Sequence, residues 1–230
     1  MRLLALDTSS IACSVALQLD DAVSELHEEQ PREHTAILMP MIESVLQTAG
    51  ASTTELDAIV LGNGPGSFIG MRIAASVAQG LAFASGLRIV PVSSLAAVAE
   101  QVFAEHGAAE VVVTQDAHMH EVYLGVYRQH DDTATAVLPE CLHDIAAIDA
   151  GDDRPLGPRV AAGFGWRRYP ELLVANQENF DAVVDVLHPR ARHLLRLGAA
   201  GLESGRAIDP RDVSPAYLRQ KVAARPAGTP

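Results

Sequence analysis

A carboxylate at the end of a predicted strand is the first residue of the sequence that could do chemistry. Asp7 follows the apolar residues 3–6, and the hydroxyl residues Thr8 and Ser9 come directly after it. A carboxylate in this position can hold hydrated Mg²⁺, while nearby hydroxyl and N–H groups can bind phosphate oxygens. The same residues also suit a plain turn that Asp7 caps, and the sequence leaves both readings open.

A glycine-rich segment between a predicted strand and a predicted helix could bind the same kind of ligand. Residues 62–67 read Gly-Asn-Gly-Pro-Gly-Ser, and N–H groups at a helix start can bind an anion. The spacing does not give the G-x-G-x-x-G of dinucleotide-binding proteins, and a tight turn against a neighbouring element explains the glycines equally well. The two loops together supply the candidate nucleotide- or anion-binding residues Asp7, Thr8, Ser9, Gly64, Gly66 and Ser67.

Several other chemistries lack their residues. Lys221 is the only lysine and lies near the C-terminus, which excludes a Walker P-loop, a kinase of the glycine-rich-loop type and Schiff-base catalysis. Ser67 does not lie in the G-x-S-x-G context of a serine hydrolase. Cys13 and Cys141 are far apart in sequence, which excludes a disulfide framework and a four-cysteine zinc module.

The histidines do not predict a metal site. His118 and His120 lie near Asp116, but the segment between them reads as a turn, which breaks the strand alternation that would place all three on one face. His34 begins a predicted helix, yet four residues later comes Leu38, so the paired helical ligands of H-x-x-x-H sites are absent. We therefore expect no metal-binding residues in this chain.

The elements that must position the two loops follow an α/β order. Apolar runs and periodicity predict strands at 3–7, 13–19, 22–26, 56–61 and 88–92, and helices at 34–49, 69–84 and 93–105. Pro40 inside the first helix predicts a kink or an early break. The first half therefore reads as a mixed sheet covered by helices.

The pattern then begins again in the second half of the chain. Strands are expected at 111–116, 121–127 and 134–138, and a helix at 190–202. Asp116 ends its strand as Asp7 does, and a short turn and a second strand follow in both halves, which indicates an internal duplication. We expect one α/β lobe at 1–107, which carries the dimerisation helices, and a less regular α/β lobe at 108–230.

Two predicted helices carry more apolar or small residues than one buried face needs. In the helix at 69–84, small residues recur every fourth position at 70, 74, 78 and 82, and again at 76, 80 and 84. This spacing lets a second helix approach closely, either within the chain or from another chain. For a dimer, the candidate interface residues are Ile37, Met41, Val45, Gly70, Ala74, Ala78 and Leu81, and glutamate at positions 74 and 78 is expected to abolish association without unfolding the chain.

Charge and hydropathy limit the partners. The net charge is −12, with 4 basic and 12 acidic residues in 1–108 against 8 basic and 3 acidic residues in 190–225. An acidic body makes a poor solitary nucleic-acid binder. The longest apolar stretch, 73–87, is too short for a membrane span, and the sequence shows no signal peptide. We expect a soluble cytoplasmic protein with no membrane partner.

Taken together, motifs along the whole chain resemble the TsaB (YeaZ) family. The resemblance is dense over residues 3–127, thin over 130–210 and returns near 215–222. The motifs that carry it are Leu4-Ala5-Leu6-Asp7-Thr8-Ser9, Gly64-Pro65-Gly66-Ser67-Phe68-Ile69-Gly70-Met71-Arg72-Ile73, Pro91-Val92-Ser93-Ser94-Leu95, Asp116-Ala117-His118-Met119 and Pro215-Ala216-Tyr217-Leu218-Arg219.

This resemblance implies an actin-like, hexokinase-like ATPase fold of the ribonuclease H-like class, built from two duplicated halves. It implies a non-catalytic scaffold or activator of the complex that places a threonylcarbamoyl group on N6 of the adenosine beside the anticodon, in tRNAs reading codons that start with A. The implied partners are a catalytic TsaD-type paralogue, a TsaE-type P-loop ATPase and tRNA held through the complex, with a homodimer when the chain is alone. ATP or ADP with Mg²⁺ is expected only in the assembled complex, and no cofactor in the isolated chain.

Two departures from the family pattern weaken independent nucleotide chemistry. Ile69 stands where the family usually has threonine, and His118 stands where it usually has arginine. The first removes a hydroxyl near the glycine-rich loop, and the second removes a permanent charge beside Asp116. The alternatives are a nucleotide-dependent phosphotransferase that uses Asp7 and residues 64–67, and a metallopeptidase-like protein.

Overall fold

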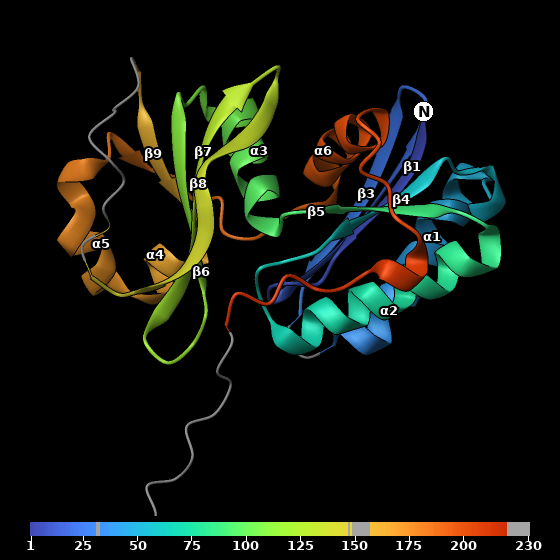
Figure 1. Cartoon of the computed structure of the whole chain (residues 1–230), viewed down its shortest axis with the longest axis horizontal. Helices are drawn as coiled ribbons and strands as arrows, with labels where there is room; N and C mark the ends of the chain where they lie inside the picture. Colours follow the sequence, from blue (N-terminus) through green and yellow to red (C-terminus); the bar gives the residue numbers. More distant parts are fainter. Residues whose placement is uncertain (31–32, 147, 149–156, 220–230) are drawn as a thin grey trace, which may run out of the picture.

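The computed structural model describes residues 1–30, 33–146, 148 and 157–219, which form two lobes (Figure 1). Strands of the first lobe are β1 (Arg2–Asp7), β2 (Ala12–Leu19), β3 (Ala22–Glu29), β4 (Ala58–Gly62) and β5 (Arg88–Val92). Strands of the second lobe are β6 (Glu110–Asp116), β7 (Glu121–His130), β8 (Thr133–Asp144), β9 (Arg159–Ala162) and β10 (Ala182–Val183). The helices are α1 (His34–Ala49), α2 (Phe68–Ser85), α3 (Ser94–His106), α4 (Phe164–Arg168), α5 (Pro170–Asn176) and α6 (Ala191–Glu203), with 3₁₀ turns η1 (Thr53–Glu55), η2 (Gln177–Asn179) and η3 (Pro210–Asp212).

The two sheets have the same topology. Within the described residues the first sheet has the order β3-β2-β1-β4-β5, and the second has β8-β7-β6-β9-β10. In each sheet the first three strands in sequence pair antiparallel, and the last two join in parallel register. The duplication expected from sequence is therefore confirmed, and the chain has the two-lobed actin-like fold.

Alternation along β1 explains how one strand serves two cores. Leu3 and Ala5 point into one hydrophobic cluster, whereas Leu4 and Leu6 point into another, because successive side chains of a strand face opposite sides of the sheet. All four are 0% exposed. A central strand buried on both faces needs a continuous apolar run, which is the pattern at residues 3–6.

Two helices each pack on the sheet formed by the other half of the chain. Helix α3 packs on β6, β7 and β8 of the second sheet, while α6 packs on β1, β2, β4 and β5 of the first. Figure 1 shows α6 beside β1 and β3, and α3 beside the second sheet. Gly198 permits the close packing of α6, since a Cβ there would lie 2.3 Å from Val60 Cγ2. The expected division into 1–107 and 108–230 therefore separates the two sheets, but not the helices that cover them.

Helix α1 continues through Pro40 without the early break that the proline predicts. It ends at Gly50, whose φ of +63° places it in the left-handed region that glycine adopts readily at a helix C-terminus. The second lobe holds the larger misses. Strand β8 extends to Asp144 rather than ending at 138, and β9, α4 and α5 were not predicted from the sequence.

Helix α2 is longer than the 15-residue apolar stretch from which no membrane span was expected. It has 18 residues, of which a third are buried, and by length and composition alone it could cross a membrane. In the structure its inner face lies against the first sheet, with Ala74, Ala78 and Ala82 at 0% exposure. This packing is that of a core helix with one free face.

Candidate functional site

A cleft separates the two lobes at the ends of β1 and β6. It encloses a cavity of about 500 Å³. The first lobe lines it with residues of the β1–β2 turn and the start of α1 and α2, and the second lobe lines it with residues near β6, α4 and α6. Its polar lining consists of Ser9, Ser10, His34, Thr35, Ser67, Gln115, Asp116, His118 and His188.

Asp7, the first of the nucleotide-binding candidates, is buried and accepts hydrogen bonds from groups of the protein itself. It is 1% exposed. Its Oδ1 accepts hydrogen bonds from the N–H and Oγ of Ser9, at 2.7 and 2.8 Å, and its Oδ2 accepts one from Ser94 Oγ at 2.6 Å. Burial raises the pKa of Asp7, and the hydrogen bonds from Ser94 and Ser9 oppose that rise. Asp7 therefore ties β1 to the start of α3 and does not line the cleft.

The glycine-rich loop packs against the β1–β2 turn. Thr8 Oγ1 donates to the carbonyl of Gly70 at 2.6 Å, and the N–H of Ser67 donates to the carbonyl of Ser9 at 2.6 Å. A Cβ on Gly66 would lie 2.2 Å from the Ser9 carbonyl oxygen, and one on Gly70 would lie 1.8 Å from that of Thr8. The close approach of the two loops therefore accounts for these glycines. This agrees with the interpretation of the segment as a tight turn against a neighbouring element.

Little remains for binding a phosphate. The N-terminus of α2 is capped by its own Ser67, whose Oγ accepts the N–H of Gly70 at 3.2 Å. Gly64, with φ of +86°, makes the turn, and its N–H donates to Ser94 Oγ at 3.0 Å. Among the described residues, no lysine or arginine lines the cavity. Of the six candidates, Ser9 and Ser67 line it.

Asp116 occupies the place of Asp7 in the second lobe but lies in a different environment. Its side chain is 15% exposed and lines the cleft. Its Oδ1 accepts hydrogen bonds from the N–H of His118 at 2.8 Å and from Tyr169 Oη at 2.9 Å. Arg168 Nε lies 3.9 Å from Oδ2. Burial and the hydrogen bond to Asp116 raise the pKa of Tyr169.

Sequence reasoning missed part of the second lobe's wall. Phe164 and His188 line the cleft, with their ring centroids 5.2 Å apart, and Tyr169 lies behind it, hydrogen-bonded to Asp116. Phe164 and Tyr169 belong to α4 and its end, and His188 belongs to the irregular segment before α6. Five- and seven-residue helices carry too few turns for periodicity to reveal them.

In the part of the chain that the structure describes, no group of three or more His, Cys, Asp or Glu side chains is placed to hold a metal ion. His118, Met119 and His120 all have positive φ, between 56° and 60°. They form the turn between β6 and β7. As predicted from the sequence, the turn interrupts the alternation of side chains that would place Asp116, His118 and His120 on one face of a strand.

Most of the expected interface residues face inward. Met41 and Val45 are 4% and 3% exposed, and Ala74 and Ala78 are 0% exposed. Gly70 is buried too, whereas Ile37 and Leu81 are partly buried against the same core. The apolar stripe at these positions forms the core of the first lobe, so glutamate at 74 or 78 would be forced into that core. The expectation that it leaves the fold intact is wrong.

The second row of small residues on α2 faces outward instead. Ser76, Gly80 and Ala84 are exposed. Large apolar side chains flank them, with Ile69 70% and Phe83 78% exposed. An open groove lies along the first half of α2 and reaches the start of α1. It is lined by Thr35 of α1 and by Phe68, Ile69, Arg72, Ile73, Ser76 and Val77 of α2. We call the exposed surface of α1 and α2 around this groove the outer helical face.

The comparisons with known proteins agree with the resemblance. A family model described as "TsaD: tRNA N6-adenosine threonylcarbamoyltransferase" matches residues 24–166. The tRNA threonylcarbamoyladenosine biosynthesis protein TsaB of Escherichia coli (strain K12) is 37% identical over 97% of this chain and 96% of its own length. The protein of that name in Bacillus subtilis (strain 168) is 28% identical over 95% of this chain and 94% of its own.

Solved structures agree as well. The structure titled "YeaZ from Pseudomonas aeruginosa" superposes with a TM-score of 0.87 at 34% identity, covering 94% of this chain and 99% of that one. A second, described as an uncharacterized protein with similarity to peptidase YEAZ from Pseudomonas aeruginosa, has a TM-score of 0.88 at 35% identity, covering 95% and 99%. From fold, length and identity together, the chain belongs to the TsaB (YeaZ) family.

Proposed function

We propose that this chain is a non-catalytic scaffold and activator in tRNA threonylcarbamoyladenosine biosynthesis. It supports the transfer of a threonylcarbamoyl group to N6 of the adenosine next to the anticodon, and a TsaD-type paralogue performs the transfer. The family membership supports the pathway. Two observations favour a non-catalytic role over phosphoryl transfer. The Asp7 carboxylate is already hydrogen-bonded to Ser9 and Ser94, and no cationic side chain lies among the described residues that line the cleft.

The observation that carries the scaffold role is the outer helical face. Exposed Ile69 and Phe83 lie on the same helix as the exposed small residues Ser76 and Gly80. Monomeric soluble proteins rarely leave such apolar surface uncovered. Small residues spaced by four let the backbone of a partner helix come close, while the flanking apolar side chains supply buried area. The TsaD-type paralogue is the partner we assign to it.

Other parts of the assembly are proposed with this role. The same face would form a homodimer when the paralogue is absent, because a twofold axis brings one patch onto its own copy. A TsaE-type P-loop ATPase joins the complex, tRNA is held through the complex, and ATP or ADP with Mg²⁺ binds only after assembly. The whole cycle takes place in the cytoplasm without a membrane.

Size exclusion with light scattering tests the scaffold role. We expect the chain mixed with its TsaD-type paralogue to elute as a 1:1 heterodimer. Gly80→Glu should abolish that species, because it places a charge on open helix surface, where a Cβ meets nothing within 4 Å. Ala104→Glu, at an exposed position of α3, is the matched control and should leave the heterodimer intact. A heterodimer that persists with Gly80→Glu would reject this interface, and no heterodimer in any sample would reject the scaffold role.

A further inference from the structure

The last described residues of the chain, 213–219, cross from one lobe to the other. They follow η3, which packs against α2. In Figure 1 this red segment leaves η3, passes along α2 and ends near the lower end of the β6–β7 hairpin. We call residues 213–219 the strap. Each end of the strap has its own set of contacts.

On the first lobe, the strap pairs with the glycine-rich loop. Asn63 Nδ2 donates to the carbonyl of Ser214 at 3.0 Å. The N–H of Ala216 donates to the carbonyl of Asn63 at 3.1 Å. Asn63 of the glycine-rich loop thus forms hydrogen bonds with two residues of the strap, Ser214 and Ala216.

An aromatic cluster strengthens the same end. Tyr217 Oη accepts a hydrogen bond from Arg72 Nε at 2.8 Å, and the Tyr217 ring lies 5.3 Å from that of Phe68. The Arg72 guanidinium lies 3.9 Å from the centroid of Phe68. Stacking and cation–π contacts of this kind stabilise the arrangement of these three side chains. The cluster therefore fixes Tyr217 to the start of α2.

On the second lobe, Arg219 holds the strap to the β6–β7 turn. Its Nη2 lies 2.5 Å from a carboxylate oxygen of Glu121 and donates to the carbonyls of Ala117 and His118, at 2.8 and 3.3 Å. The Arg219 side chain is 17% exposed, so water screens this pair only in part. Charge-assisted bonds from one guanidinium to a carboxylate and to backbone carbonyls make a strong and directional anchor.

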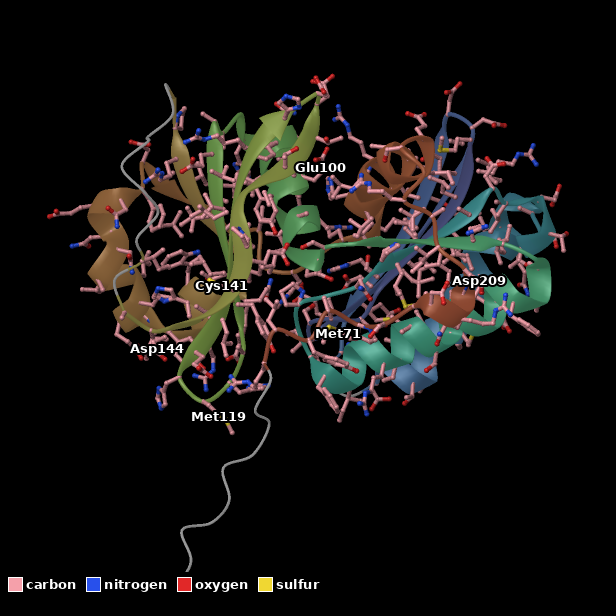
Figure 2. The ribbon with its side chains drawn as sticks, in the orientation of Figure 1. Met71, Glu100, Met119, Cys141, Asp144 and Asp209 are labelled. Atoms are coloured by element: carbon pink, nitrogen blue, oxygen red, sulfur yellow. The ribbon has the colours of Figure 1, made fainter. Side chains whose placement is uncertain are left out.

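The strap also forms a wall of a hollow that adjoins the cleft. A cavity of about 280 Å³ lies between the lobes, with Tyr217 and Arg219 in its lining. Met71 of α2 and Met119 of the β6–β7 turn, both labelled in Figure 2, line it from the two lobes. It shares Ser67, Ile69, Asp116 and His118 with the cleft itself. The spacing of the lobes at the strap therefore governs the size of both cavities.

We propose that the strap is an inter-lobe tie that sets the opening of the cleft. The lobes share a hydrophobic core where α3 and α6 exchange, and the strap crosses below those helices in the view of Figure 1. With one tie at the exchanged helices and a second at the strap, relative rotation of the lobes is blocked. Release of Arg219 from Glu121 and the turn carbonyls leaves, among the described residues, the tie at α3 and α6, about which the cleft opens.

Distance measurements between spin labels on the full-length chain test this proposal. Labels go on Val23→Cys in β3 and Val174→Cys in α5, both exposed, in a Cys141→Ser background, since Cys13 is 0% exposed. Dilution with unlabelled chain removes distances between molecules. The test variant is Arg219→Ala, and the matched control is Arg211→Ala, because Arg211 pairs with Asp209 in the preceding turn.

We expect one narrow distance distribution for the unaltered chain and for Arg211→Ala, and a distribution at least twice as broad for Arg219→Ala. Tyr217→Ala, which removes the other end of the strap, should broaden the distribution likewise. Hydrogen exchange at the Ala216 amide should accelerate at least tenfold in both strap variants. Distributions that match the unaltered chain in both strap variants would overturn the proposal, because the strap would then tie nothing.

Discussion

Asp7 and Asp116 end equivalent strands, yet their surroundings give them different roles. Asp7 is fully enclosed and accepts hydrogen bonds from Ser9 and Ser94, whereas Asp116 borders the cleft. The sequence shows the pair and its spacing, but not which partners the fold brings to each carboxylate. Ser94 lies 87 residues from Asp7, a separation over which no local pattern predicts contact.

Replacement of Asp7 should therefore affect stability. Asp7→Ala leaves the buried hydroxyls of Ser9 and Ser94 without their acceptor, and we expect a loss of about 3 kcal/mol. That corresponds to a fall of roughly 6–12 °C in Tm for a chain of this length. Asp116→Ala, at the partly exposed counterpart, should lower the Tm by less than half as much. Thermal unfolding followed by circular dichroism measures both, and equal losses would contradict this division.

The partly buried His193 of α6 should make the stability of the fold decrease at acidic pH. Burial lowers its pKa to about 4, with Arg192 and Arg190 adding to that effect against Glu105 and Glu25. The unfolded chain, with a pKa near 6.5, binds the proton more readily. Stability is thus complete above pH 6.5 and falls as the pH drops toward 4, by at most about 2 kcal/mol at pH 5.

Urea denaturation at pH 8 and pH 5 measures this loss. His193→Leu should reduce the difference between the two pH values, because the side chain no longer titrates. His27 and His188, whose pKa values burial also lowers, act in the same direction and should leave part of the difference in place. An undiminished pH dependence in His193→Leu would show that His193 is already solvated in the folded state.

At the scale of elements, the periodicity of α2 predicts a helix but not its inward face. Both rows of small residues repeat every four positions, and only the packing shows that Ala74 and Ala78 contact the sheet while Ser76 and Gly80 face solvent. The strands and long helices of the first lobe could be predicted because each carries several repeats of its pattern. Helices α4 and α5 could not, since five and seven residues are too few to repeat a helical pattern, and α4 is held by its contacts with β6.

Two helical glycines provide a matched test of this assignment. At Gly80 of α2 a Cβ would meet nothing within 4 Å, whereas at Gly198 of α6 it would lie 2.3 Å from Val60. Gly80→Ala should stabilise the chain by about 0.5–1 kcal/mol through helix propensity. Gly198→Ala should destabilise it by about 1–3 kcal/mol through overpacking. Chemical denaturation measures the change in the free energy of unfolding for each variant. Two changes of the same sign would contradict the orientation assigned to one of the two helices.

For the whole molecule, the exchange of α3 and α6 makes the two lobes one folding unit. A single hydrophobic cluster contains Leu3 and Val60 of the first sheet, Val111 of the second, and Leu95 and Leu194 of the exchanged helices. The repeated strand order could be read from the sequence as a duplication. The exchange could not, because an amphipathic helix matches either sheet equally well. The central claim at this scale is a division of labour, in which the outer helical face serves function and the cleft performs no chemistry.

A reconstituted transfer reaction tests that claim most directly. It contains this chain or a variant, the TsaD-type paralogue, the TsaE-type P-loop ATPase, a threonylcarbamoyl donor and unmodified tRNA. The readout is the amount of threonylcarbamoyladenosine formed. Asp116→Asn, which keeps the acceptor Oδ1 for Tyr169 and His118, should stay within twofold of the unaltered chain. Gly80→Glu should fall at least tenfold, to the level found without this chain. Loss of product with Asp116→Asn, while light scattering still shows the heterodimer, would contradict the account and place chemistry in the cleft.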